Sequence, residues 1–145
     1  MARSPDALPT RQDIDIFGSL DEAAACKNFL GKSLAQAEEM FRSNALHYQE
    51  DLMWMGPVAF KFYLPAATRY FASDAAHDDA DGIAALLRTI KFRAGDEHFS
   101  SAHHEVNQLL DVVMLHYPKF DIDESIFGDL RALCAELRLI SVPTP

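Results

Sequence analysis

Apolar residues recur at helical spacing along most of this chain of 145 residues. After Gly82, five of them occupy positions i, i+3, i+4, i+7 and i+11, namely Ile83, Leu86, Leu87, Ile90 and Ala94. A second series covers residues 106–117 and stops at Pro118, and a third covers residues 126–137. A period of about 3.6 residues places each series on one helix face, so the pattern predicts three amphipathic helices around a shared core.

Helix start and end signals predict three more helices upstream. Ser19 is followed three residues later by Glu22, and Ser33 by Gln36, which is the spacing of a capping box. A further helix is expected over residues 45–55, because glycine follows directly and favours a helix end.

The segment DLMWMGPVAFKFYLPAATRYF, residues 51–71, contains the only tryptophan and is apolar on nearly all sides. Its apolar residues alternate over residues 58–64, a pattern that suits a strand, yet an all-round apolar helix would also be buried. The pattern leaves helix and strand open there. Since no partner strand is evident, we favour a short helical turn and then a second helix from Pro65 to about Ser73. We interpret the segment as core, with Trp54 as its candidate for an interface.

These elements predict an all-α protein, a single-domain irregular bundle of about six helices. The bundle is expected to span residues 14–140. Residues 1–13 hold two prolines and few apolar side chains, so they are expected to form a loose N-terminal arm, and residues 141–145 a C-terminal tail.

The net charge of −9 narrows the classes of partner. An acidic surface repels nucleic acid and anionic lipid and favours a basic protein partner. No apolar run approaches the roughly 20 residues of a membrane span, and the N-terminus lacks the apolar core of a secretory signal. Cys26 and Cys134 fit buried thiols of a reducing compartment. We therefore expect a cytoplasmic protein of bacterial type that binds neither nucleic acid nor membrane.

The motif FKFYLPA, residues 60–66, resembles a segment of small uncharacterised bacterial helical proteins that carry an aromatic-Tyr-Leu-Pro-Ala core motif. The resemblance covers about residues 45–120. It implies a helical fold and a role as an immunity or accessory protein. It implies no catalytic residues.

Acidic and aromatic residues suggest a binding surface for a protein partner. Four aspartates fall within residues 74–81, where an exposed loop leads into the next helix. A calcium loop does not fit, because His77 and Arg88 stand where the EF-hand pattern requires Asp and Glu. The predicted partner-binding residues are Glu50, Asp51, Trp54, Asp74, Asp78, Asp79 and Asp81.

The sequence holds no recognisable catalytic motif, so we predict no catalytic residues and no cofactor, and we favour a non-enzymatic binding domain. The sequence GKS at residues 31–33 lacks the earlier glycine of a phosphate loop. A metal-binding protein or metal-dependent enzyme is the alternative, with two histidine–aspartate pairs on facing helices as ligands. These residues are His47, Asp51, His104 and Asp111. A self-associating structural domain, a homo-oligomer, is the third hypothesis.

Overall fold

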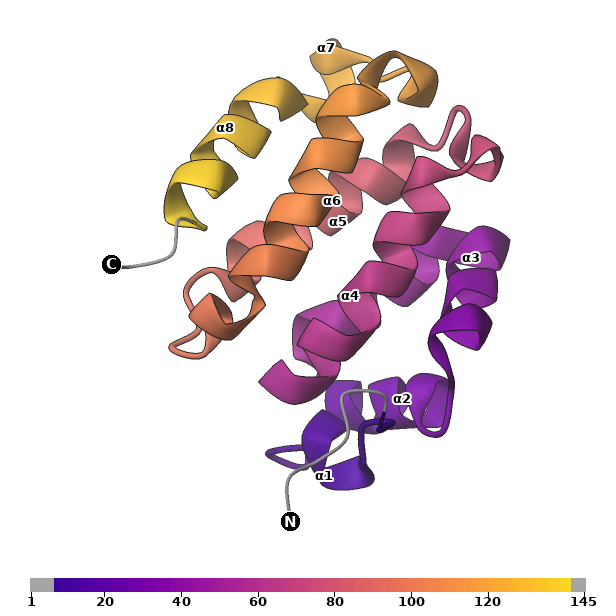
Figure 1. The fold of residues 1–145 in the computed structure, drawn as a ribbon, viewed down its shortest axis with the longest axis vertical. Helices are drawn as coiled ribbons and strands as arrows, with labels where there is room; N and C mark the ends of the chain where they lie inside the picture. The colour runs from indigo at the N-terminus through magenta and orange to yellow at the C-terminus, as the bar shows by residue number, and fades with distance from the viewer. Residues whose placement is uncertain (1–6, 142–145) are drawn as a thin grey trace.

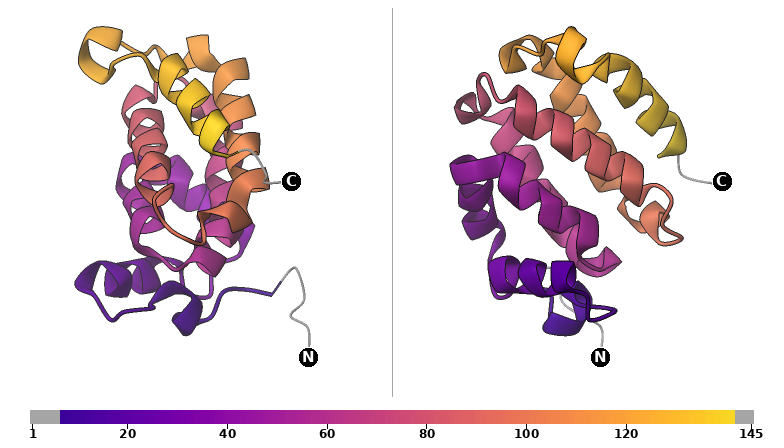
Figure 2. Two further views of the ribbon diagram at one scale, coloured as in Figure 1. Left: turned by 90° about the vertical axis from the view of Figure 1, so that its left-hand side faces the viewer. Right: turned by 180° about the vertical axis from the view of Figure 1, so that it is seen from behind.

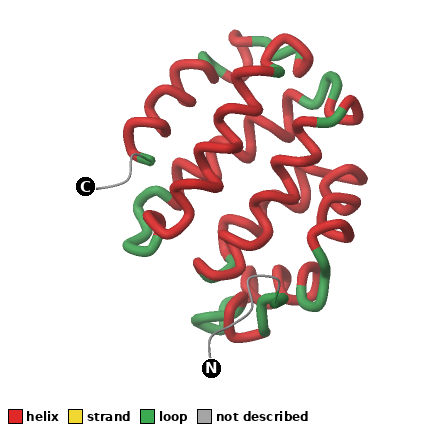
Figure 3. Tube along the Cα trace, viewed as in Figure 1, coloured by secondary structure: helices red, strands yellow, loops and turns green. Residues whose placement is uncertain are grey.

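The computed structural model describes residues 7–141, and over that range the chain is all-α: helices are joined by turns and no strand is present (Figures 1 and 3). The α-helices are α1 (Arg11–Ile14), α2 (Leu20–Phe29), α3 (Leu34–Trp54), α4 (Pro57–Ala72), α5 (Ala80–Arg93), α6 (His103–Leu115), α7 (Glu124–Phe127) and α8 (Leu130–Ile140). Three 3₁₀ turns connect them, η1 (Asp74–Ala76), η2 (Phe99–Ala102) and η3 (Tyr117–Phe120). The predicted fold class is confirmed.

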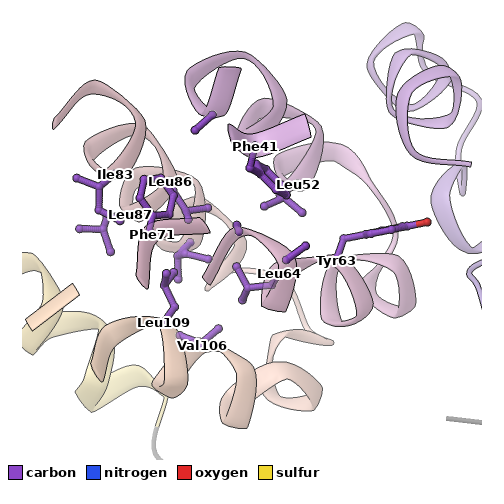
Figure 4. Close-up of a cluster of buried hydrophobic side chains, with 14 of the residues drawn as sticks. Phe41, Leu52, Tyr63, Leu64, Phe71, Ile83, Leu86, Leu87, Val106 and Leu109 are labelled. Carbon is purple, nitrogen blue, oxygen red and sulfur yellow. The ribbon is translucent and has the colours of Figure 1, made fainter. Parts of the chain in front are cut away.

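The helices form two layers, with α4 and α6 on one side and α3 and α5 on the other (Figures 1 and 2). Helix α8 packs across α5 and α6, while α1 and α2 lie at the end of the bundle near the N-terminus. Helix α4 contacts α1, α3 and α6. Figure 4 shows Leu64 of α4 among apolar side chains of its neighbours. The aromatic segment is therefore core, as its composition predicts.

Helix α4 runs without interruption through Pro65, so the predicted break at this residue is wrong. Proline removes one backbone N–H and its ring crowds the carbonyl of Lys61, but the helix is buried on both sides of it. Leu64 and Ala66 are fully buried, and burial of such side chains offsets the loss of one hydrogen bond. The hydroxyl of Thr68 also donates to the Leu64 carbonyl at 3.2 Å. Residues 58–64 are thus helix.

Helix α3 bends sharply at Asn44, whose backbone leaves the helical region with φ −166° and ψ 80°. The Asn44 side-chain oxygen accepts a hydrogen bond from the backbone N–H of His47 at 3.1 Å, so it restarts the helix as a cap would. The predicted helix over residues 45–55 matches this second half.

The last predicted helix divides at Gly128, which has a φ of 81°. Helices α7 and α8 replace the single helix, and Ile126, expected on the core stripe, is 69% exposed. A positive φ is incompatible with a continuing helix, and glycine adopts it without strain.

Helical structure begins before residue 14. Thr10 and Asp13 form a capping box around α1, within the segment expected to be a loose arm, and Ile14 is fully buried. At the other end Ser141 is buried, and its carbonyl accepts a hydrogen bond from Asn107 at 2.8 Å. Residues 1–6 of the arm and 142–145 of the tail lie outside the described residues. Within the described part of the chain, no helix has the length and hydropathy of a membrane span.

Candidate functional site: a groove beside Trp54

Asp51 is buried and cannot belong to a binding surface as predicted. Its carboxylate accepts a hydrogen bond from the Asn28 side chain at 2.8 Å and joins α3 to α2. Burial raises the pKa of Asp51, partly opposed by the hydrogen bond from Asn28. Glu50 next to it is exposed. Successive side chains of a helix point about 100° apart, so Glu50 faces solvent while Asp51 faces the core. Counting charges along the sequence does not reveal this difference.

Asp79 is a structural residue. Its carboxylate accepts a hydrogen bond from the backbone N–H of Gly82 at 2.9 Å, which caps α5, and another from the Tyr70 hydroxyl at 2.6 Å. Burial raises the pKa of Tyr70, and the Asp79 carboxylate raises it further. Because both oxygens of Asp79 hold the fold, this residue is not a free contact for a partner, contrary to the prediction.

The remaining aspartates of the acidic loop, Asp74, Asp78 and Asp81, are exposed. Asp78 has a φ of 64°, and its backbone N–H donates to the Lys119 carbonyl at 3.0 Å. The Lys119 ammonium donates to the carbonyl of Phe71 in the last turn of α4 and to that of Ser73, its C-cap, and so places a cation beside the loop. This loop offers charge without an exposed large apolar side chain.

A groove of about 790 Å³ lies elsewhere, at the junction of α3 and α4. Three stretches distant in sequence line it: residues 16–22 before and within α2, residues 53–57, and residues 92–98 at the end of α5 and just after it. Trp54 lies in its wall, and the exposed large apolar side chains of the lining are Ile16, 47% exposed, Phe17, 89% exposed, and Phe92, 57% exposed. Concave apolar surface of this kind is typical of a binding site.

Gly56 brings the N-terminal segment against the start of α4. Its backbone N–H donates to the Ile14 carbonyl at 3.0 Å. A Cβ atom at this position would lie 2.8 Å from the Ile16 side chain and would collide with the Asp13 carbonyl. Only glycine allows this approach, which places Ile16 and Phe17 on one side of the groove.

Glu22 holds the turn that carries Phe17. Its buried carboxylate accepts hydrogen bonds from the backbone N–H groups of Ile16, Phe17 and Ser19 and from the Ser19 hydroxyl. Burial acts to raise the pKa of Glu22, but the hydrogen bonds outweigh it and the pKa is lowered. Ionised Glu22 thus fixes one wall of the groove.

Arg93, which also lines the groove, is only 6% exposed. Its Nη1 donates to the carbonyls of Leu52, Met53 and Met55 at the end of α3, and its guanidinium lies 4.6 Å from the centre of the Phe60 ring. Nη2 lies 3.5 Å from the Asp96 carboxylate. Burial lowers the pKa of Arg93, and Asp96 opposes this shift. Arg93 is therefore a buried part of the fold rather than a solvated cation.

Two buried N–H groups in the groove wall have no acceptor among the described residues, Nε1 of Trp54 and Nε of Arg93. The Trp54 ring packs edge-on against the exposed Phe92 ring, with 5.7 Å between centroids. Buried donors without acceptors are uncommon in folded proteins, and here two of them belong to residues that line one groove.

The alternative metal ligands His47, Asp51, His104 and Asp111 do not come together. Among residues 7–141, no group of three or more His, Cys, Asp or Glu side chains is arranged to hold a metal ion. Helix α4 packs against both α3, which carries the first pair, and α6, which carries the second. Asp111 instead pairs with Arg138 at 2.7 Å. The arrangement of the described residues therefore does not support the alternative hypothesis of a metal site.

A comparison of this chain with protein-family models, curated proteins and solved structures gave no match. The resemblance of FKFYLPA to a bacterial family therefore stays a prediction.

Trp54 is the one predicted site residue that lines the groove. Phe17, Glu22 and Phe92 also line the groove but are not among the site residues predicted from the sequence. Phe92 carries a usable signal, since it is a large apolar residue outside the apolar stripe of its helix. No sequence pattern indicates that Phe17 lines a groove or that Glu22 holds its turn, because both depend on how the N-terminal segment folds onto α4.

Proposed function

We propose that this chain is a non-enzymatic protein-binding domain and that the groove beside Trp54 is its binding surface. The observation that carries the proposal is the exposure of Phe17 and Phe92 at the edges of a concave apolar groove whose wall contains the only tryptophan. Tryptophan and other aromatic side chains are enriched where binding energy concentrates at interfaces.

The buried polar groups of the groove support binding rather than catalysis. The carboxylate oxygens of Glu22 accept four hydrogen bonds from residues 16–19, and Arg93 donates hydrogen bonds to carbonyls at the end of α3. Groups held this way rigidify the walls, and a rigid site loses less entropy when a partner binds.

The narrower role of an immunity or accessory protein that masks its partner belongs to this proposal and rests on the FKFYLPA resemblance. The acidic character of the chain supports a basic partner, since opposite charge speeds encounter. Cytoplasmic location stays a prediction.

The test compares two double variants as bait in extracts of the native host. Phe17→Ser/Phe92→Ser removes the exposed aromatic rings of the groove, and Asp78→Lys/Asp81→Lys reverses charge in the acidic loop. All four residues are exposed, so both variants are expected to fold, which circular dichroism would check.

A captured protein is then purified and titrated against each bait by calorimetry. We expect one partner per domain and an affinity loss of about tenfold or more for the groove variant, with a smaller loss for the loop variant. A partner that binds the groove variant as tightly as the wild type would overturn the assignment of the surface. Failure of any purified protein to bind would overturn the function.

A further inference from the structure

The charges around the groove restrict the chemistry of what it binds. The most exposed carboxylate in its lining is Glu97, whose side chain is 84% exposed, and Asp96 beside it is 32% exposed. Glu97 lies 3.1 Å from His98. The arginine of the lining is buried, and among the described residues no lysine lines the groove.

Cations near Phe92 on α5 are engaged elsewhere. Lys91 pairs with Glu136 of α8 at 3.3 Å, and Arg88 donates to the Phe127 carbonyl at 3.1 Å. Neither lines the groove. The mouth of the groove is therefore apolar with an acidic edge, on a chain whose net charge is −9.

We propose that the occupant is a peptide segment of a partner protein in which a large apolar side chain stands next to lysine or arginine. This inference rests on the proposed function. The apolar side chain packs between Phe17 and Phe92 against Trp54, and the neighbouring cation lies beside Glu97. Apolar contact supplies affinity, and the charge pair selects the segment.

A second copy of this chain fits less well. A symmetric contact through the groove would bring two Glu97 side chains and two chains of net charge −9 together. Like charges at close range oppose association. A dimer is therefore an outcome that the experiment has to recognise.

The experiment uses three short fluorescein-labelled peptides of equal length. The first has a phenylalanine–leucine core flanked by lysines, the second has the same core flanked by glutamates, and the third has lysines around a serine core. Anisotropy reports binding, and emission of Trp54, the only tryptophan, reports contact at the groove when the peptides lack tryptophan.

At low salt we expect the first peptide to bind about tenfold tighter than either of the others, and this preference over the glutamate peptide to shrink at high salt. Glu97→Lys should reduce the preference for lysine flanks. Glu39→Lys is the matched control, because it changes the net charge equally at an exposed site that does not line the groove.

Equal binding of the lysine and glutamate peptides, or an equal effect of the two charge reversals, would overturn the inferred chemistry. If the glutamate peptide binds and the Phe17→Ser/Phe92→Ser variant abolishes it, the groove remains a protein-binding site and only this inference fails. Binding of no peptide, or a dimer in light scattering that Phe92→Ser dissociates, would also overturn it.

Discussion

Replacing Glu22 by glutamine tests how the groove is held together. The carboxylate is 4% exposed and accepts four hydrogen bonds, with one oxygen facing the N–H groups of Ile16 and Phe17 and the other facing Ser19. Glutamine keeps the shape but has one carbonyl oxygen, so its amide N–H₂ must face either the pair of N–H groups or Ser19. The change therefore removes charge and places donor against donor.

The expected loss of stability follows from these bonds. A hydrogen bond to a charged group contributes about 1.5–3 kcal/mol, and the variant weakens all four bonds and loses at least one of them. We expect the free energy of unfolding to fall by about 2–3 kcal/mol. For a chain of this size each kcal/mol lowers the melting temperature by about 2–4 °C, so the midpoint should drop by about 4–12 °C. Urea unfolding at neutral pH measures the difference directly.

The difference should also depend on pH. Burial acts to raise the pKa of Glu22, but hydrogen bonds in the folded protein outweigh it and hold the pKa below the ordinary value of 4.5. The unfolded chain therefore binds its proton first as the pH falls. The stabilisation by the carboxylate is fully present above pH 4.5 and is lost as the pH drops through the lower folded pKa.

Two results would refute this reasoning about Glu22. One is a stability difference between wild type and Glu22→Gln that stays constant from neutral pH to well below pH 4.5. The other is a neutral-pH loss no larger than that of Glu39→Gln. That control removes a carboxylate that is 70% exposed and is expected to change stability by about 0.5 kcal/mol or less.

Other substitutions test the packing around the groove and in the core. Gly56→Ala should cost about 1–3 kcal/mol in urea unfolding, because its Cβ collides with the backbone of Asp13; a cost near zero would show that the N-terminal segment yields freely. Tyr63→Phe should cost about 1–3 kcal/mol, since the hydroxyl shares its one proton between the Phe29 and Lys32 carbonyl oxygens, each 2.8 Å away, and an unchanged melting temperature would contradict this. Asp79→Ala should cost about 2 kcal/mol by removing both the cap of α5 and the acceptor of Tyr70, with Asp81→Ala as a near-neutral control.

The parts of the fold that follow from local chemistry were predictable. The boxes at Ser19 and Ser33 form as their spacing predicts, and each begins a helix at the following residue. The apolar stripe after Gly82 lies in α5, where Ile83 and Leu86 are fully buried. Such signals depend on residues within one or two helical turns of each other, so the sequence carries them without tertiary information.

The errors arise where distant segments decide the outcome. Helix α4 continues through Pro65 because α3 and α6 bury it. Asp51 is buried where it accepts a hydrogen bond from Asn28. Arg93 is buried where it donates hydrogen bonds to three carbonyls at the end of α3. Each is a polar or helix-breaking residue whose local preference is outweighed by a partner remote in sequence. The groove was missed for the same reason, since its three walls meet only in the folded chain.

The walls of the groove link stability to binding. Residues 16–19 carry Phe17, and they are held through Glu22 and through the backbone bond between Gly56 and Ile14. A partner that packs on Phe17 binds the ordered form of this segment and stabilises it by mass action. Loosening the segment by Glu22→Gln should then weaken a groove-bound partner although Glu22 is buried. The same substitution should leave a partner on the acidic loop unaffected, because that loop is anchored instead through Lys119. Measuring how Glu22→Gln changes the affinity for a partner therefore shows whether that partner binds the groove or the acidic loop, although Glu22 itself contacts neither partner.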